Sequence, residues 1–230
     1  MLHDFFKYVV EKHGALDKSA PLNSHELQSL VEVLPEHLVG LYQAYGRCIL
    51  RKGLLQVCHP VDLKEILKLV LKSDPDINHE NSHAFAYSPF GDIYFYNHRY
   101  GCGSIELLSG KIFNNELTSS AEISHFIDNT VFMPFSLSDE SLDFTDPLGK
   151  PLFKKSTKKC GELNIGECYG FVPALGLGGE PDISNVCRLK APEYFAIIAQ
   201  LQDFYLMETL DSGQTKEVRK IGSLDSNEAT

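Results

Sequence analysis

The chain has 230 residues, of which 43% are hydrophobic, 10% aromatic and 23% charged, as in a globular protein rather than a disordered one. Its formal net charge of -10, from 31 acidic and 21 basic residues, argues against direct binding of nucleic acid, because phosphate contacts need clustered lysine and arginine. This length allows one compact domain or two small, tightly joined halves.

The six cysteines are scattered along the chain without a CxxC pair, which predicts free thiols in a reducing compartment. The first residues lack the basic region, apolar stretch and cleavage site of a signal peptide. No segment approaches the roughly 18 apolar residues that a membrane span needs. We therefore expect a cytoplasmic protein with no membrane partner.

Helices and a strand alternate at the start of the chain. The spacing of apolar residues predicts a helix over 4–13 and a second helix over 35–45, which Gly46 ends. Residues 53–58 have the pattern of a buried strand, and the apolar spacing over 61–72 predicts a third helix.

From residue 84 the apolar period changes to two. Strands over 84–88, 93–97 and 104–108, separated by tight turns, predict an antiparallel meander. The aromatic residues of this region could be mistaken for a base-stacking surface, but only one basic residue, Arg99, lies between 74 and 110. Packing within the sheet is the better interpretation of these six residues: Phe85, Tyr87, Phe90, Tyr94, Phe95 and Tyr96.

Helix and strand signals return in the second half. Ser119 or Ser120 could cap a helix, and a block rich in glycine and proline follows at 166–179. A short strand over 186–190 and an amphipathic helix over 191–201 come next. Within the block, six residues are expected to be core and turn residues rather than partner contacts: Tyr169, Phe171, Val172, Pro173, Ala174 and Leu175.

Charge changes sign sharply in the second half. Residues 138–146 contain four acids and no base, whereas residues 150–159 contain five lysines. Two solvated faces of helices or loops would explain this pattern without any specific binding role. The acidic run is nevertheless the first candidate for contacting a basic protein.

One segment, His79-Glu80-Asn81-Ser82-His83, matches the HExxH pattern of zinc hydrolases. That chemistry needs a helix to place both histidines on one face, and here the segment runs directly into a predicted strand. A third ligand would have to come from His98, Glu106 or Glu116, none of which lies in a motif of its own. We therefore expect no metal site.

Other catalytic and cofactor motifs are missing. The Gly176-Leu-Gly-Gly179 sequence has neither the spacing of a dinucleotide fingerprint nor the lysine of a phosphate loop. No nucleophile elbow, kinase set or calcium loop occurs. We expect no cofactor and no enzymatic activity.

Five segments and their order resemble the bacterial GAD-like domain family, whose C-terminal portion is shared with immunity proteins of type VI secretion DNase effectors. The first four are Leu34-Pro-Glu-His-Leu, Tyr42-Gln-Ala-Tyr-Gly46, Gly53-Leu-Leu-Gln-Val-Cys-His-Pro60 and Phe90-Gly-Asp-Ile-Tyr94. The fifth is Glu167-Cys-Tyr-Gly-Phe-Val-Pro-Ala-Leu-Gly-Leu-Gly-Gly179, followed by the terminal helix. The resemblance covers about residues 1–205.

The expected fold is α+β, an antiparallel sheet with packed helices in two tightly joined halves. The resemblance implies a GAD-like half over 1–115 and an immunity-protein C-terminal half over 116–207. Periodicity is lost from about Glu208, so residues 208–230 are expected to be a mobile tail.

The resemblance also implies a cytoplasmic antitoxin that binds a cognate effector toxin, a basic nuclease, and covers its active site or DNA cleft. An acidic inhibitor would be steered toward the positive surface that a nuclease needs for its substrate. Charge density then suggests the partner-binding residues Asp139, Glu140, Asp143 and Asp146, with Leu142 and Phe144 supplying apolar contact. Two alternatives remain open: a regulatory or small-ligand-binding module that uses a pocket between the halves, and a zinc hydrolase at His79 and His83.

Overall fold

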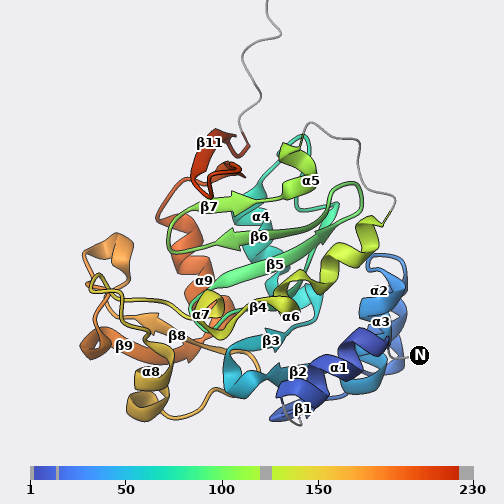
Figure 1. The fold of residues 1–230 in the computed structure, drawn as a ribbon, viewed down its shortest axis with the longest axis horizontal. Coiled ribbons are helices and arrows are strands. Elements are labelled where there is room, and N and C mark those ends of the chain that lie inside the picture. The colour runs from blue at the N-terminus through green and yellow to red at the C-terminus, as the bar shows by residue number, and fades with distance from the viewer. Residues whose placement is uncertain (1–2, 14–15, 120–125, 223–230) are drawn as a thin grey trace, which may run out of the picture.

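A computed structural model of the protein describes residues 3–13, 16–119 and 126–222. Within these residues nine strands form one large sheet in the order β1-β2-β3-β4-β5-β6-β7-β10-β11, and β8 pairs with β9 in a second, small sheet (Figure 1). Neighbouring strands are antiparallel throughout, except that β10 lies parallel to β7. The expected α+β fold with an antiparallel sheet and packed helices is confirmed.

The strands of the large sheet are β1 (Lys18–Ala20), β2 (Arg47–Leu50), β3 (Leu55–Val57), β4 (Ser82–Tyr87), β5 (Asp92–Asn97), β6 (Gly101–Glu106), β7 (Lys111–Phe113), β10 (Tyr205–Thr209) and β11 (Thr215–Lys220). Those of the small sheet are β8 (Glu167–Phe171) and β9 (Val186–Lys190). The α-helices are α1 (Asp4–His13), α2 (Ser24–Val31), α3 (Glu36–Tyr45), α4 (Lys64–Leu71), α5 (Asn115–Thr118), α6 (Met133–Ser136), α7 (Asp139–Leu142), α8 (Phe153–Cys160) and α9 (Ala191–Gln200). Short 3-10 turns are η1 (Arg51–Gly53), η2 (Pro60–Leu63), η3 (Ile127–Phe132), η4 (Leu175–Leu177) and η5 (Ile183–Asn185).

Most elements expected from periodicity are present in the described structure. The helices over 4–13 and 35–45 correspond to α1 and α3, and the predicted meander forms β4, β5 and β6. The helix over 61–72 is divided into the turn η2 and α4. The helix expected to begin at Ser119 or Ser120 falls largely on residues 120–125, which lie outside the described residues.

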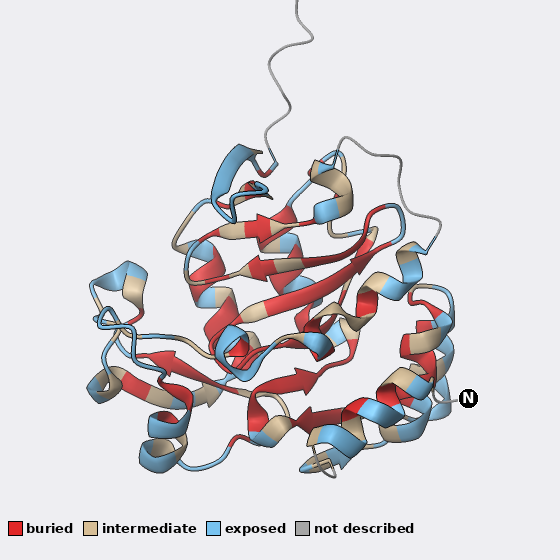
Figure 2. Cartoon of the chain, in the orientation of Figure 1, coloured by how far each residue is buried: buried red, intermediate tan, exposed pale blue. Residues whose placement is uncertain are grey.

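The central strand β5 is buried on both faces. Its side chains alternate between two hydrophobic clusters, so that Tyr94 and Tyr96 belong to one cluster while Ile93 and Phe95 belong to the other. Figure 2 shows β4 to β7 as a mostly buried layer between the flanking helices. An antiparallel sheet with one wet face would alternate apolar and polar residues, so the near-continuous apolar run of β5 reflects cover on both sides.

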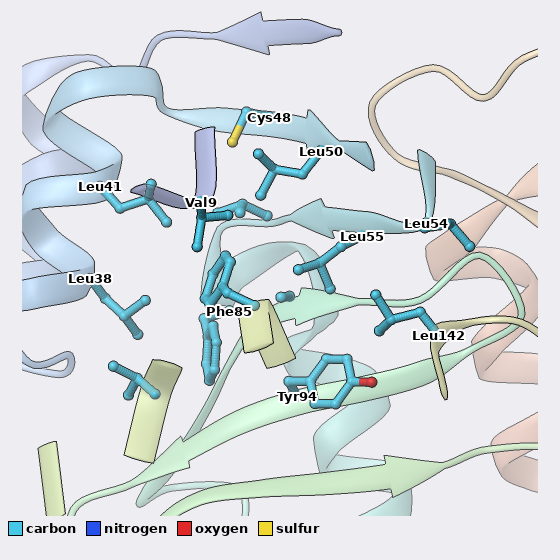
Figure 3. Packing of buried hydrophobic residues seen from close by; sticks show 14 of the residues in the cluster. Val9, Leu38, Leu41, Cys48, Leu50, Leu54, Leu55, Phe85, Tyr94 and Leu142 are labelled. Carbon is cyan, nitrogen blue, oxygen red and sulfur yellow. The ribbon is translucent and has the colours of Figure 1, made fainter. Parts of the chain in front are cut away.

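The two clusters draw side chains from both halves of the chain. On one face, α1, α3 and the second-half residue Leu142 pack against β2 to β5. Figure 3 shows Leu142 pointing into this cluster toward Tyr94 and Leu55. On the other face, α4 packs beside α9, which contributes Phe195 and Ile198. Each half therefore supplies part of both cores.

The second half of the chain is a long connection between two neighbouring strands. Strand β7 ends at Phe113, and the next strand of the large sheet, β10, begins at Tyr205 and pairs directly with it. Everything between them, including β8, β9 and α9, is an excursion that returns to the same sheet. Among the described residues, no helix combines the length and apolar character needed to cross a membrane.

The structure corrects the expectation of a tail that begins at residue 208. Residues 208–209 complete β10, and residues 215–220 form β11, so the described part of this segment is ordered secondary structure. Arg219 explains why: its guanidinium pairs with Asp74, which is fully buried, and with Asp76 at 2.8 Å. These ion pairs join residues that are far apart in sequence, so the local spacing of apolar residues does not predict them. Residues 223–230 lie outside the described residues.

Replacing Arg219 with alanine should destabilise the fold strongly, because it leaves the buried carboxylate of Asp74 without its charged partner. We expect a loss of about 3 kcal/mol in the free energy of unfolding, measured by urea titration. Lys216→Ala, which removes an exposed cation from the same strand, should change that free energy by less than about 0.5 kcal/mol. Equal effects from the two substitutions would contradict the structural role of Arg219.

The same carboxylate should make stability depend on pH. Burial acts to raise the pKa of Asp74, but hydrogen bonds from Arg219 and from backbone N–H groups outweigh it, so the pKa lies below its ordinary value of 3.8. A lowered folded-state pKa gives a stabilisation that is present above the unfolded-state pKa and is lost as pH falls through the folded-state pKa. The difference in unfolding free energy between wild type and Asp74→Asn should therefore be large at pH 7 and shrink below about pH 4.

Candidate functional site

The acidic segment, residues 138–146, is packed against the body of the protein by its apolar residues. Leu142 is fully buried, and the ring of Phe144 lies 5.6 Å from that of Phe90 and 5.3 Å from that of Phe171. The expected partner-facing role of these two apolar residues is wrong for Leu142, which no partner can reach in this arrangement. Phe144 is half-buried and joins the segment to both halves.

Two of the four acids in this segment make local backbone hydrogen bonds. The carboxylate of Asp143 accepts the backbone N–H of Phe153 at 2.8 Å, at the start of α8. Burial raises the pKa of Asp143, against the hydrogen bonds that stabilise its charge. Asp146 accepts the N–H groups of Leu148 at 3.0 Å and Lys150 at 2.8 Å, which closes the turn before α8. Both carboxylates therefore organise their own loop.

The other two acids, Asp139 and Glu140, are exposed at the start of α7. The side chain of Asp139 is 61% exposed and pairs at 2.8 Å with Arg51. Glu140 is exposed, and hydrogen bonds from its own backbone and from Ser138 hold its pKa below the usual value. Of the six residues expected to bind a partner, these two present exposed carboxylates to solvent.

Arg51, which sequence reasoning missed, anchors this surface from the first half. Its side chain is only 6% exposed and donates a 2.8 Å hydrogen bond to the backbone carbonyl of Leu137, besides its ion pair with Asp139. Arg51 and Lys52 both have left-handed backbone conformations, with φ of 55° and 59°, and the N–H of Lys52 donates to Asp17 at 2.7 Å. Because non-glycine residues rarely adopt a positive φ, the sequence does not predict this conformation.

A cavity of about 440 Å³ lies beside α7. The residues that line it include three basic ones, Arg51, Lys52 and Lys154. They also include two acidic ones, Asp139 and Glu162. Lys154, from the lysine run 150–159, lies in α8 and lines this cavity together with Asp139. The surface beside α7 is therefore not uniformly acidic.

A second cavity, of about 280 Å³, lies where the two halves meet. Arg47, Gln56 and Tyr87 line it from the first half, and Gly166 and Lys190 line it from the second. Hydrogen bonds cross this junction, from Gln56 to the carbonyl of Glu167 at 2.8 Å and from Gly166 to Gln56 at 3.2 Å. The expected pocket between the halves is therefore present as a small cavity with a mixed apolar and polar lining.

The HExxH segment does not lie on a helix. His83 is in strand β4, and His79 is in the preceding turn, where its Nδ1 lies 2.8 Å from the carbonyl oxygen of Lys72. Burial lowers the pKa of His83 to about 4. No group of three histidine, cysteine or acidic side chains in the described part of the chain is arranged to hold a metal ion. The geometry gives no support to the zinc alternative.

The block at 166–179 divides into a buried part and an exposed part. Tyr169, Phe171 and Ala174 are buried, as expected of core residues. Val172 and Pro173, expected among the core and turn residues, lie in the bend after β8 and are exposed, and the side chain of Leu177 is exposed further along the same loop. The division falls at the end of β8, whose last four residues are all buried.

Comparison with known proteins matches the two halves separately. Residues 4–109 match the family model of the GAD-like domain, and residues 131–202 match the model described as T6SS immunity protein Tdi1, C-terminal. The solved crystal structure of Atu4351 from Agrobacterium tumefaciens superposes with a TM-score of 0.88 at 26% sequence identity, covering 95% of this chain and 99% of that one. The comparison with curated proteins gave no match.

The first half carries a GAD-like domain, and the second half carries the C-terminal domain of type VI secretion immunity proteins, as the motifs predict.

Replacing Asp143 should affect stability through its hydrogen bond to the start of α8. Asp143→Ala removes the acceptor and should cost about 1 kcal/mol in unfolding free energy, the usual value for a lost helix-start acceptor. Asp143→Asn keeps an acceptor oxygen and should cost less than half as much. Thermal or urea unfolding measures both, and a larger loss for asparagine than for alanine would contradict this role.

Proposed function

We propose that this immunity protein binds a cognate type VI secretion effector, a DNase, and inhibits it by covering its active site or DNA cleft. The observation that carries the proposal is the match of residues 131–202 to the immunity-protein C-terminal model. The protein acts by binding and performs no catalysis. A cytoplasmic location is part of the proposal and is supported by six free cysteines, which suit a reducing compartment.

Charge supports a basic partner. The chain carries a net charge of -10, and an enzyme that binds DNA needs a positive surface, so the two proteins would attract each other before contact. Asp139 and Glu140 are the proposed partner-facing carboxylates of α7. Asp143 and Asp146 shape the loop behind them, while Leu142 and Phe144 hold it against the core.

Co-expression with the product of the neighbouring gene tests the proposed function. The immunity protein should restore growth of cells that make the effector, should co-purify with it, and should abolish DNA cleavage by the purified effector. Rescue of growth without co-purification would overturn inhibition by occlusion. Binding without loss of DNA cleavage would overturn the covering of the active site, and a purified effector that does not cleave DNA would overturn the DNase assignment.

Reversing the charge of Glu140 should slow association with the effector. We expect Glu140→Lys to reduce the association rate constant several-fold at low salt and less at high salt, because the carboxylate acts through long-range attraction. Glu32→Lys, at an exposed acid in the first half, changes the net charge equally and serves as the matched control. Surface plasmon resonance at two ionic strengths measures the effect; equal slowing by both variants would remove Glu140 from the interface.

A second candidate function, small-ligand binding, is favoured by the cavity between the halves. Its volume of about 280 Å³ and its mixed lining of Tyr87, Val57, Arg47 and Lys190 suit a small molecule with an apolar body and a polar end. A ligand held at 100 times its Kd should stabilise the fold by about 2.7 kcal/mol, visible as a shift of the unfolding midpoint. If no metabolite in a panel shifts the unfolding midpoint while the effector still binds, the small-ligand function is contradicted and the immunity function stands.

A further inference from the structure

The cavity of about 440 Å³ beside α7 contains a buried arginine in its lining. Arg51 lines this cavity, and its side chain is only 6% exposed. Its guanidinium donates to the carbonyl of Leu137 at 2.8 Å through Nη1 and pairs with Asp139 at 2.8 Å through Nη2. Its Nε is buried and has no hydrogen-bond acceptor among the residues that the structure describes. Because a buried donor without an acceptor is unfavourable, this N–H is a candidate donor to a ligand.

The backbone at this arginine has an unfavourable conformation. Arg51 and Lys52 have φ of 55° and 59°, in the left-handed region that residues other than glycine rarely adopt. The bend is held within the first half, because the N–H of Lys52 donates to Asp17 at 2.7 Å and the N–H of Leu54 donates to the carbonyl of Arg51 at 3.2 Å. Strained backbone of this kind is concentrated at binding and catalytic sites. Here it directs two successive basic residues to the same cavity.

The charged residues of the lining are basic by one charge, in a chain whose net charge is -10. They are Arg51, Lys52, Lys154, Asp139 and Glu162. Asp139 is already paired with Arg51, and Glu162 is exposed. Glu140 lies outside the lining but close enough to Lys154 for their charges to interact. Within the described parts of the chain, neither Lys52 nor Lys154 forms an ion pair.

The rest of the lining is apolar or uncharged. Leu54 and Phe153 are both buried, and they reduce the exposure of the cavity to water, which strengthens hydrogen bonds made inside it. Burial and the nearby cations Arg51 and Lys12 lower the pKa of His13, against the charge of Asp139, which raises it. The imidazole of His13 is therefore neutral at pH 7 and adds no charge to the cavity.

We propose that this cavity binds an oxyanion, a phosphate or carboxylate group, with Arg51 as the buried donor and Lys52 and Lys154 as the surrounding cations. The Nε of Arg51 donates a charge-assisted hydrogen bond to an oxygen of the anion, and the two ammonium groups balance its charge. The volume of about 440 Å³ accommodates a small organic phosphate or carboxylate as well as the inorganic ion. This inference does not rest on the proposed function.

Inorganic phosphate is the first probe of the site. Isothermal titration calorimetry at constant ionic strength should show saturable binding with a Kd below about 1 mM. Lys154→Gln should raise this Kd about fivefold or more, because it removes a cation from the lining. Lys158→Gln is the matched control, since Lys158 is exposed on the same helix but lies outside the lining. Absence of saturable binding up to about 10 mM phosphate, or equal weakening by both variants, would overturn the site.

Lys52→Gly separates phosphate binding from stability. Glycine adopts a φ of 59° without strain, so the thermal unfolding midpoint should equal or exceed that of wild type, while the Kd for phosphate rises several-fold. Lys72→Gly is the matched control, because Lys72 also has a positive φ, of 52°, and is exposed outside the lining. Its Kd should equal that of wild type. Phosphate binding that is unchanged in both Lys52→Gly and Lys154→Gln would overturn the proposal.

Nuclear magnetic resonance of the wild-type protein gives a readout that needs no substitution. The Nε–H signal of Arg51 should move downfield when phosphate binds, because this N–H gains an acceptor. Bound phosphate should also raise the pKa of His13, since an anion favours the protonated imidazole. Phosphate binding that leaves both signals unchanged would place the anion elsewhere and overturn the site.

The effector distinguishes the two sources of the oxyanion. The Kd for the purified product of the neighbouring gene is measured with and without phosphate at constant ionic strength. A Kd that phosphate does not change identifies a free small molecule as the ligand. A Kd that rises with phosphate in wild type, and less in Lys154→Gln, identifies a carboxylate of the effector. A wild-type chain that does not bind the effector at all would overturn the proposed function and leave the phosphate result unaffected.

Discussion

The two-sided burial of β5 is the constraint on which the rest of the structure depends. Its successive side chains enter two different cores, so both faces of the sheet must be covered if these residues are to leave water. The first half covers one face with α1 and α3 and part of the other with α4. The second half completes both covers, with Leu142 and Phe171 on one side and Phe195 on the other. The matched immunity region is therefore part of the fold's core and is not an appended module.

The way in which the two halves cover the sheet determines which residues face solvent. Because Leu142 and Phe144 must pack against the sheet, the start of α7 is held at the surface, and Asp139 and Glu140 project from it. Strand β8 likewise buries Tyr169 and Phe171, and Val172, in the bend after the strand, is exposed. Neighbouring residues in sequence thus divide into buried residues that stabilise the protein and residues that are exposed to solvent.

Local periodicity was sufficient to predict the long helices and the meander, because these elements are specified by the spacing of their own apolar residues. It did not predict α2, although Asn23 and Glu26 form a capping box that was available in the sequence. It also missed β11, whose burial pattern is almost fully exposed and whose position depends on the distant partner Asp74.

The candidate site shows the same limit. Charge density in the sequence identified the acidic segment. It could not distinguish the acids that hold the loop, Asp143 and Asp146, from the exposed acids at the start of α7. That separation depends on where the backbone N–H groups of Phe153 and Lys150 lie in three dimensions. The contact of Arg51 with this segment could not be predicted either, because Arg51 lies in the first half, far away in sequence. In the block at 166–179 the sequence did not separate buried Tyr169 and Phe171 from exposed Val172, because that division depends on how the chain bends after β8.

The parallel pairing of β7 with β10 has a consequence for how the protein is made. Residue 111 lies opposite residue 205, so the sheet cannot close until a long stretch of chain has been synthesised and has folded back. Before that point the apolar faces of β5 and β6 lack part of their cover, and a partly made chain is exposed to aggregation. If the chain inhibits a nuclease as proposed, protection can start only once translation has passed β10, which sets a minimum delay between the start of synthesis and resistance.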